Sequence, residues 1–86
     1  MSQEERMEFS LAGKVVQIGR DDIIKVASDP RISSFRYKTV YVEIGNEKYP
    51  AKGLISLVTG IPTGQFSTSD AKTILKRLGF KIVEVR

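Results

Sequence analysis

Apolar residues alternate with polar ones most regularly between residues 38 and 44. Every second position at the end of this stretch is a β-branched apolar residue, at Val40, Val42 and Ile44. A period of two is typical of a β-strand with one buried face. Gly45-Asn46 follows directly, and this dipeptide suits the two-residue primed turn that joins hairpin strands. The pattern therefore predicts a strand over 38–44, a turn, and a second strand over 47–49.

Pro50 marks a change from strand to helix in the next segment. Proline has no N–H to donate to a strand partner, but it fits the first turn of a helix. The segment 51–59 that follows has a broad apolar stripe, made of Leu54, Ile55, Leu57 and Val58. We expect a helix here, directly after the strand, with Lys52 on its first turn. The glycine- and proline-containing segment 60–65 predicts a loop, with an exposed tip at residues 63–65.

The clearest helical period lies near the C-terminus. Apolar residues recur at i, i+3, i+4 and i+7, at Ala71, Ile74, Leu75 and Leu78. Ser67 and Asp70 resemble a capping box with aspartate in place of glutamate. Gly79 suits the left-handed position that follows a helix. These features predict a helix from about Ser67 to Leu78, and then a strand over 80–85 beside the strand that contains Tyr41.

The N-terminal third has a less regular pattern. Leu11, Val15 and Ile18 are spaced i, i+4 and i+7, which predicts a helix within 9–19. Gly19 would end it. Gly13 and the β-branched pair at 15–16 favour a short strand instead, so the residues are consistent with both structures. We expect the helix.

A second short helix is predicted over 20–28. Asp21 and Asp22 stand in its first turn, where the helix dipole favours carboxylates. Pro30 forbids its continuation. Its apolar face is expected to consist of Ile23, Ile24 and Ala27. Residues 31–36 then form a polar connector, with Ile32 or Phe35 beneath it.

Together these elements predict a small α+β fold. We expect a single domain over 9–86, with about four short helices packed on a three-stranded, mainly antiparallel sheet, and a flexible N-terminus over 1–8. The chain has 86 residues. A chain of this length buries only about 60–65% of the surface that its unfolded form exposes, so its stability is expected to be marginal.

The composition lacks the residues of most catalytic sites. The chain has neither cysteine nor histidine, which excludes thiol nucleophiles, imidazole bases and the usual zinc ligands. Asp21 and Asp22 are adjacent, so their side chains diverge on a helix, and the other carboxylates show no metal-binding spacing. We therefore expect no enzyme activity, catalytic residue, metal or cofactor. No apolar run approaches the ~18–20 residues of a membrane span, so we expect a cytoplasmic protein without a membrane partner.

The positive charge is concentrated in the later part of the chain. Residues 1–30 carry four basic and six acidic side chains (4 − 6 = −2), whereas residues 31–86 carry ten and four (10 − 4 = +6). Such a basic region suits contact with phosphates, and helix starts such as that at Lys52 attract them too. The residues expected to bind nucleic acid are Lys48, Lys52, Lys72, Lys76 and Arg77, with Tyr49 beside them and Arg36 and Lys38 at the edge.

Two functions remain open on residue chemistry alone. The first is a non-catalytic accessory module that binds the phosphate backbone of nucleic acid, with DNA as the expected partner. The second is a protein-interaction or self-associating domain, in which the basic side chains form a solvated surface and serve solubility.

One combination of short motifs spans residues 41–82: Tyr41-x-Glu43, Gly45, the run Lys48-Tyr49-Pro50-Ala51-Lys52-Gly53-Leu54-Ile55, Gly60, Phe66, and the run Leu75-Lys76-Arg77-Leu78-Gly79-Phe80-Lys81-Ile82. This combination resembles the N-terminal head module of ScoMcrA-like, modification-dependent HNH restriction endonucleases. The resemblance implies an accessory domain of a DNA-acting enzyme, with Lys52 as a backbone contact and Tyr49 as its structural anchor. The chain has no HNH segment, so the resemblance carries over neither catalysis nor recognition of modified bases.

Overall fold

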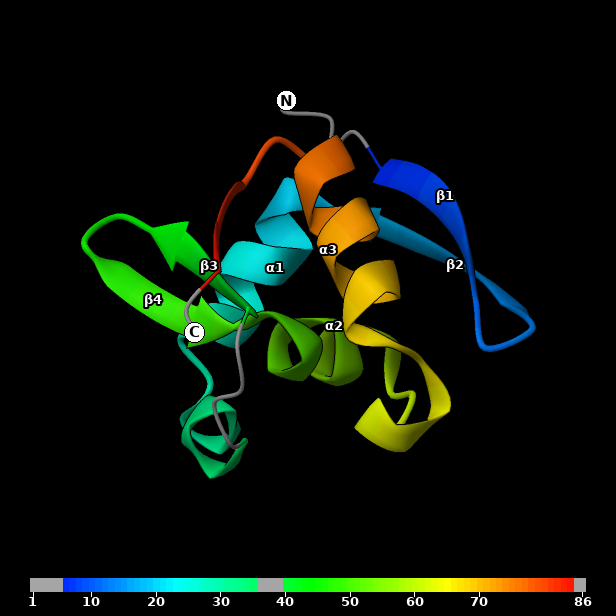
Figure 1. The fold of residues 1–86 in the computed structure, drawn as a ribbon, viewed down its shortest axis with the longest axis horizontal. Coiled ribbons are helices and arrows are strands. Elements are labelled where there is room, and N and C mark those ends of the chain that lie inside the picture. The colour runs from blue at the N-terminus through cyan, green and yellow to red at the C-terminus, as the bar shows by residue number, and fades with distance from the viewer. Residues whose placement is uncertain (1–5, 36–39, 85–86) are drawn as a thin grey trace.

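The computed structural model describes residues 6–35 and 40–84. Figure 1 shows two antiparallel sheets at opposite ends of the molecule, with the helices between them. The elements follow in the order β1 (Arg6–Leu11), β2 (Lys14–Gly19), α1 (Arg20–Ala27), the 3₁₀ turn η1 (Pro30–Ser34), β3 (Val40–Ile44), β4 (Glu47–Pro50), α2 (Ala51–Thr59), the 3₁₀ turn η2 (Thr63–Gln65), α3 (Thr68–Arg77) and β5 (Lys81–Glu84).

The three-stranded sheet has the strand order β4-β3-β5, and both pairings are antiparallel. Val42 is fully buried at its centre, and its partners across the sheet are Tyr49 and Ile82. Gly45 has a φ of 62°, which the first central residue of a primed hairpin turn requires. The predicted hairpin and the pairing of the C-terminal strand with the Tyr41 strand are therefore confirmed where the structure describes them. Positions 38, 39 and 85 of the predicted strands lie outside the described residues.

The junctions around α2 and α3 also follow the sequence pattern. β4 ends at Pro50, and α2 begins at the next residue. The capping box of α3 forms as expected, because the Asp70 N–H donates to Ser67 Oγ at 3.0 Å and the Ser67 N–H donates to Asp70 Oδ2 at 3.1 Å. Gly79 has a φ of 89° after the helix, as the left-handed cap requires. The predicted change from strand to helix at Pro50 is confirmed.

The predicted helix within 9–19 is wrong, because the chain there forms the hairpin β1–β2. Its turn is Ala12-Gly13, with φ values of 52° and 75°, and the register pairs Phe9 with Val16. β1 begins at Arg6, so residues 6–8 of the expected flexible N-terminus are paired in this strand. Residues 1–5 lie outside the described residues.

Helix α1 follows β2 without a loop. The Gly19 N–H donates to Asp22 Oδ2 at 2.9 Å, so this first-turn carboxylate holds the start of the helix, as the sequence predicts. Arg20 ties the same end of α1 to the end of α3. Its Nη1 donates to the Leu78 carbonyl at 2.8 Å, and its guanidinium lies 4.4 Å from the centroid of the Phe80 ring.

One hydrophobic cluster joins both sheets to the helices. Its largest fully buried side chains come from β1, β2, α1, β3, α2 and α3: Leu11, Ile18, Ile23, Val42, Leu54, Ile55 and Leu75. The α+β class is thus correct, but the described residues form three α-helices and two sheets rather than four helices on a single sheet. No helix in the described ranges is long and apolar enough to cross a membrane.

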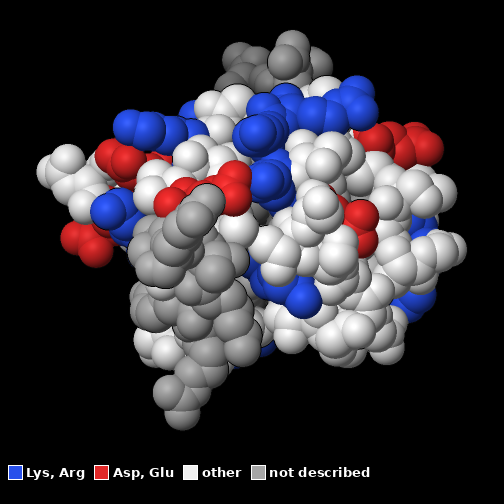
Figure 2. Space-filling view, in the orientation of Figure 1, with Lys and Arg blue, Asp and Glu red and all other residues white. Residues whose placement is uncertain are grey.

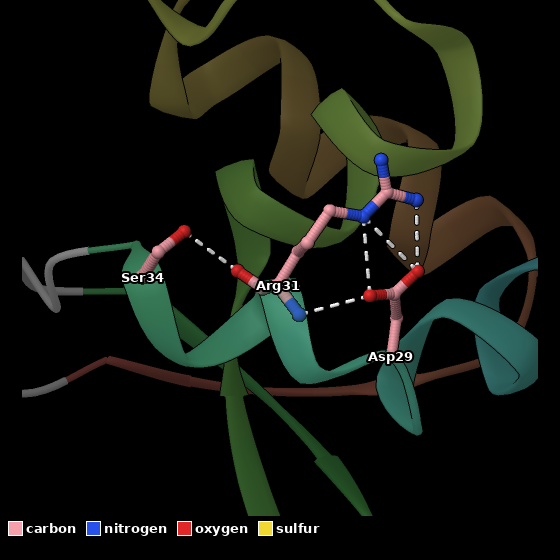
Figure 3. A network of polar contacts seen from close by, with 3 residues as sticks. All are labelled: Asp29, Arg31 and Ser34. Atoms are coloured by element: carbon pink, nitrogen blue, oxygen red, sulfur yellow. Dashed lines mark hydrogen bonds and ion pairs between the residues drawn. The ribbon is translucent and has the colours of Figure 1, made fainter.

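Asp29 and Arg31 form a compact polar network at the start of η1, which Figure 3 shows from close by. The Arg31 N–H donates to Asp29 Oδ1 and its Nη2 donates to Asp29 Oδ2, both at 2.8 Å. Ser34 Oγ donates to the Arg31 carbonyl at 2.7 Å. The hydrogen bonds from the Arg31 side chain, and then from its backbone, lower the pKa of Asp29 from its usual 3.8 to about 2.

Replacing Arg31 by methionine, which has no side-chain donor, is expected to raise the pKa of Asp29 towards its usual value. The substitution removes the side-chain hydrogen bond, which is the largest cause of the lowering, and keeps the backbone one. Because the pKa is lower in the folded state, ionised Asp29 stabilises the fold above about pH 4, and this stabilisation is lost as the pH falls towards 2. A carboxyl NMR titration of both proteins measures the change. Glu84 serves as the control, because Lys72 and not Arg31 lowers its pKa, which should therefore stay the same. An unchanged titration midpoint of Asp29 would contradict the role given to the Arg31 side chain.

Candidate nucleic-acid interface

The change from strand to helix at Pro50 sets the position of Lys52. Pro50 is the N-cap residue of α2 and gives no side-chain hydrogen bond to the first turn. Lys52 is the second residue of the helix, and its side chain is half-buried. Its Nζ lies 5.3 Å from the centroid of the Phe66 ring. Since Phe66 directly precedes the capping residue of α3, this cation–π contact brings the Lys52 ammonium group to the N-terminal end of α3.

A cavity of about 510 Å³ opens beside this junction. It is bounded by the end of η1, the start of β3, the first turn of α2, η2 and the first residue of α3. The described residues that line it are Ser34, Phe35, Val40, Pro50, Ala51, Lys52, Gly53, Thr63 and Thr68.

Gly53 allows the aromatic wall of this cavity to approach α2. A Cβ placed on Gly53 would lie 2.8 Å from Cγ of Phe35, closer than real Cβ atoms come to other atoms, and 3.1 Å from Cβ of Phe35. The absence of a side chain at Gly53 therefore lets Phe35 pack directly on the first turn of the helix. The sequence predicts that Phe35 or Ile32 packs beneath the connector. In the structure Phe35 packs against Gly53 of α2.

Three of the expected basic residues lie along α3. Lys76 and Arg77 are exposed in its last turn, and Lys72 is half-buried one turn earlier. In Figure 2 basic side chains gather over the upper part of this face, where Figure 1 places α3. The guanidinium of Arg77 lies 5.9 Å from the centroid of the Phe9 ring, so Arg77 leans towards the β1–β2 hairpin.

Lys72 is partly neutralised by an acidic residue of β5. Its Nζ donates to Glu84 Oε2 at 2.9 Å. This hydrogen bond, with the charge of Lys72 and a smaller effect of Lys76, lowers the pKa of Glu84. The carboxylate side chain is 59% exposed, and ion pairs at such exposed positions contribute little to stability. A phosphate can therefore compete with Glu84 for Lys72 at little cost.

Lys48 and Tyr49 do not belong to the row on α3. Lys48 is paired across the sheet with Glu43, which also forms an ion pair with Lys81 at 3.6 Å. Residues in these positions point away from the Val42 side of the sheet, because side chains alternate along a strand. Tyr49 is on the Val42 side and packs against the core. Arg36 and Lys38 lie outside the described residues.

We therefore divide these basic residues, with Lys81 added, into two surfaces. The α3 row consists of Lys52, Lys72, Lys76 and Arg77, and the sheet pair consists of Lys48 and Lys81. The sequence reasoning missed the cavity beside the α3 row, with its hydroxyl groups on Ser34, Thr63 and Thr68. The one sequence signal for it is a glycine in the first turn of a helix, since glycine is unfavourable there unless another group needs the space.

The described part of the chain has no group of three or more acidic side chains placed to hold a metal ion. No family model, curated protein or solved structure matches the chain.

Proposed function

We propose that the domain is a non-catalytic module that binds the phosphate backbone of nucleic acid through the α3 row. Backbone contacts need positive side chains in a row that follows the strand, and they carry little information about sequence. The resemblance to the head module of HNH restriction endonucleases supports DNA as the partner. The proposal keeps Lys52, Lys72, Lys76 and Arg77 as contacts and leaves out Lys48.

The observation that carries this proposal is the position of Lys52 at the N-terminal end of α3. Lys52 belongs to α2, but its contact with the Phe66 ring adds its positive charge to the basic side chains of α3. Lys72 and Lys76 are four residues apart, which is a rise of about 6 Å along the helix. The row therefore extends over the length of α3, as contact with several successive phosphates requires.

Binding is expected to weaken steeply as salt increases. Four phosphate contacts give a plot of log affinity against log salt concentration with a slope of about −3 to −4. The double variant Lys52→Ala/Lys76→Ala is expected to reduce the magnitude of this slope by about 2, because each substitution removes about one phosphate contact. Fluorescence anisotropy with a labelled oligodeoxynucleotide across a salt series measures both slopes.

The matched control is Lys48→Ala/Lys81→Ala, which removes the same charge from the opposite side of the sheet. It is expected to leave the slope within about 0.5 of the wild-type value, as only long-range attraction changes. Equal losses in both double variants would show that net charge, rather than the α3 row, governs binding. Absence of any binding at low salt would refute the proposed function.

The second candidate is a protein-interaction or self-associating domain, which is favoured by the edges of the larger sheet. β4 and β5 are its outer strands, and among the described residues each pairs with a strand on one side only. Such edges can receive a strand from another chain. A dimer in light scattering at micromolar concentration, together with no binding of DNA, would favour this function over the first.

A further inference from the structure

The cavity at the α2 start adjoins the α3 row directly. Lys52 belongs to both, because it lines the cavity and its Nζ lies over the Phe66 ring. Thr68 lines the cavity as the first residue of α3, and Lys72 follows it by four positions on the same helix. Residues four apart on a helix are neighbours on one face. A strand bound along the α3 row therefore passes the mouth of the cavity.

The lining suits a flat group that is apolar on its faces and polar at its edges. Phe35, Val40, Pro50 and Ala51 contribute apolar surface. Ser34 donates its hydroxyl proton to Arg31 and so offers its oxygen as an acceptor. The hydroxyl groups of Thr63 and Thr68 have no hydrogen-bond partner among the described residues, so both can donate to a ligand or accept from it. Nucleobases have these properties, since they stack on aromatic rings and form hydrogen bonds at their edges.

The cavity is large enough to receive a single base. Its volume of about 510 Å³ lies within the roughly 300–1,000 Å³ of small-molecule sites. A base in a duplex is paired and stacked and would first have to leave the helix, which costs a few kcal/mol. We propose that this cavity receives one unpaired base, so that the preferred partner of the domain is single-stranded nucleic acid. This inference rests on the proposed function, because the α3 row must bind the phosphates on either side of the base.

The first test compares three labelled ligands on the wild-type protein at one salt concentration. These are an oligothymidylate of about 12 nucleotides, a duplex of the same length, and an abasic strand that keeps the phosphates and sugars. We expect the oligothymidylate to bind at least about 10-fold more tightly than the abasic strand, since stacking of one base contributes on that order. The oligothymidylate should also bind more tightly than the duplex, by a similar factor.

The second test fills the cavity. Thr63→Leu places a larger side chain in the lining and is expected to weaken oligothymidylate binding by about 10-fold, while leaving abasic-strand binding within about twofold. Gln65→Leu is the matched control, because Gln65 is exposed in the same 3₁₀ turn and does not line the cavity. Circular dichroism melts of both variants establish that they are folded.

The outcomes separate this inference from the proposed function. Equal affinity for all three ligands would overturn the base site and leave phosphate binding intact. The same conclusion would follow if the two leucine variants bound oligothymidylate as well as the wild type. If none of the ligands bound at low salt, the proposed function would fail, and the base site with it.

Discussion

Replacing Ile23 by alanine is expected to lower the free energy of unfolding by about 2–5 kcal/mol. Ile23 is fully buried on α1, and its truncation leaves a cavity that the surrounding side chains fill only in part. A domain of 86 residues has a total stability of roughly 4–13 kcal/mol, so the loss is a large share of the whole. Thermal unfolding by circular dichroism should show a midpoint at least about 10 °C lower.

The neighbouring isoleucine provides the control for this prediction. Ile24 is 42% exposed on the same helix, so Ile24→Ala loses less buried surface, and alanine is the better helix former. Its effect is expected to stay within about 0.5 kcal/mol, as for most surface substitutions. Similar losses for the two variants would contradict the orientation of α1 against the core.

These two isoleucines show what the sequence pattern could resolve. The sequence predicts Ile23, Ile24 and Ala27 together as the apolar face of this helix, but only Ile23 and Ala27 are buried. In an eight-residue helix the apolar period is sampled over barely two turns. The rotation of so short a helix is set by contacts with α2 and β2, which no local pattern contains.

The N-terminal hairpin was missed because its apolar residues fit two periods. Leu11 and Ile18 are buried in the structure, but Val15, the third member of the expected helical stripe, is 67% exposed. The turn at residues 12–13 interrupts the alternation of apolar and polar residues, which begins anew in the second strand. The signal that identifies the strand is Met7, Phe9 and Leu11, which alternate with Arg6, Glu8 and Ser10. In the later part of the chain, glycines and prolines separate the elements, and there the predicted elements are confirmed.

The candidate site was predictable only in part, for a related reason. Helical spacing brings Lys72 and Lys76 together, and Pro50 places Lys52 at a helix start. The contact of Lys52 with Phe66 and the separation of Lys48 from the α3 row depend on how β4, α2 and α3 pack. These distances in space have no counterpart in the spacing of the residues along the chain.

Gly53→Ala is expected to destabilise the domain by up to about 2 kcal/mol, although helix propensity alone predicts the opposite. Alanine in place of glycine stabilises a helix by about 0.5–1 kcal/mol. The added methyl group, however, would lie 2.8 Å from Cγ of Phe35. Atoms at the root of a ring cannot yield as a flexible chain end can, and overpacking of this kind costs about 1–3 kcal/mol. The steric cost is therefore expected to exceed the gain in propensity.

A double-mutant cycle with Phe35→Ala distinguishes the two effects. Phe35→Ala removes the ring and its 2.8 Å contact and leaves only the Cβ contact at 3.1 Å, which a shift of a few tenths of an ångström relieves. Gly53→Ala should then become stabilising by up to about 0.5–1 kcal/mol, so that the sign of its effect reverses. Gly64→Ala is the control, since no atom lies within 4 Å of its added Cβ. Urea unfolding of the four proteins in the cycle measures the coupling, expected at about 1–3 kcal/mol. If Gly53→Ala stabilised the wild type as much as Gly64→Ala does, the Phe35 ring would not be held against α2. The cavity would then lack the fixed aromatic wall on which a base can stack.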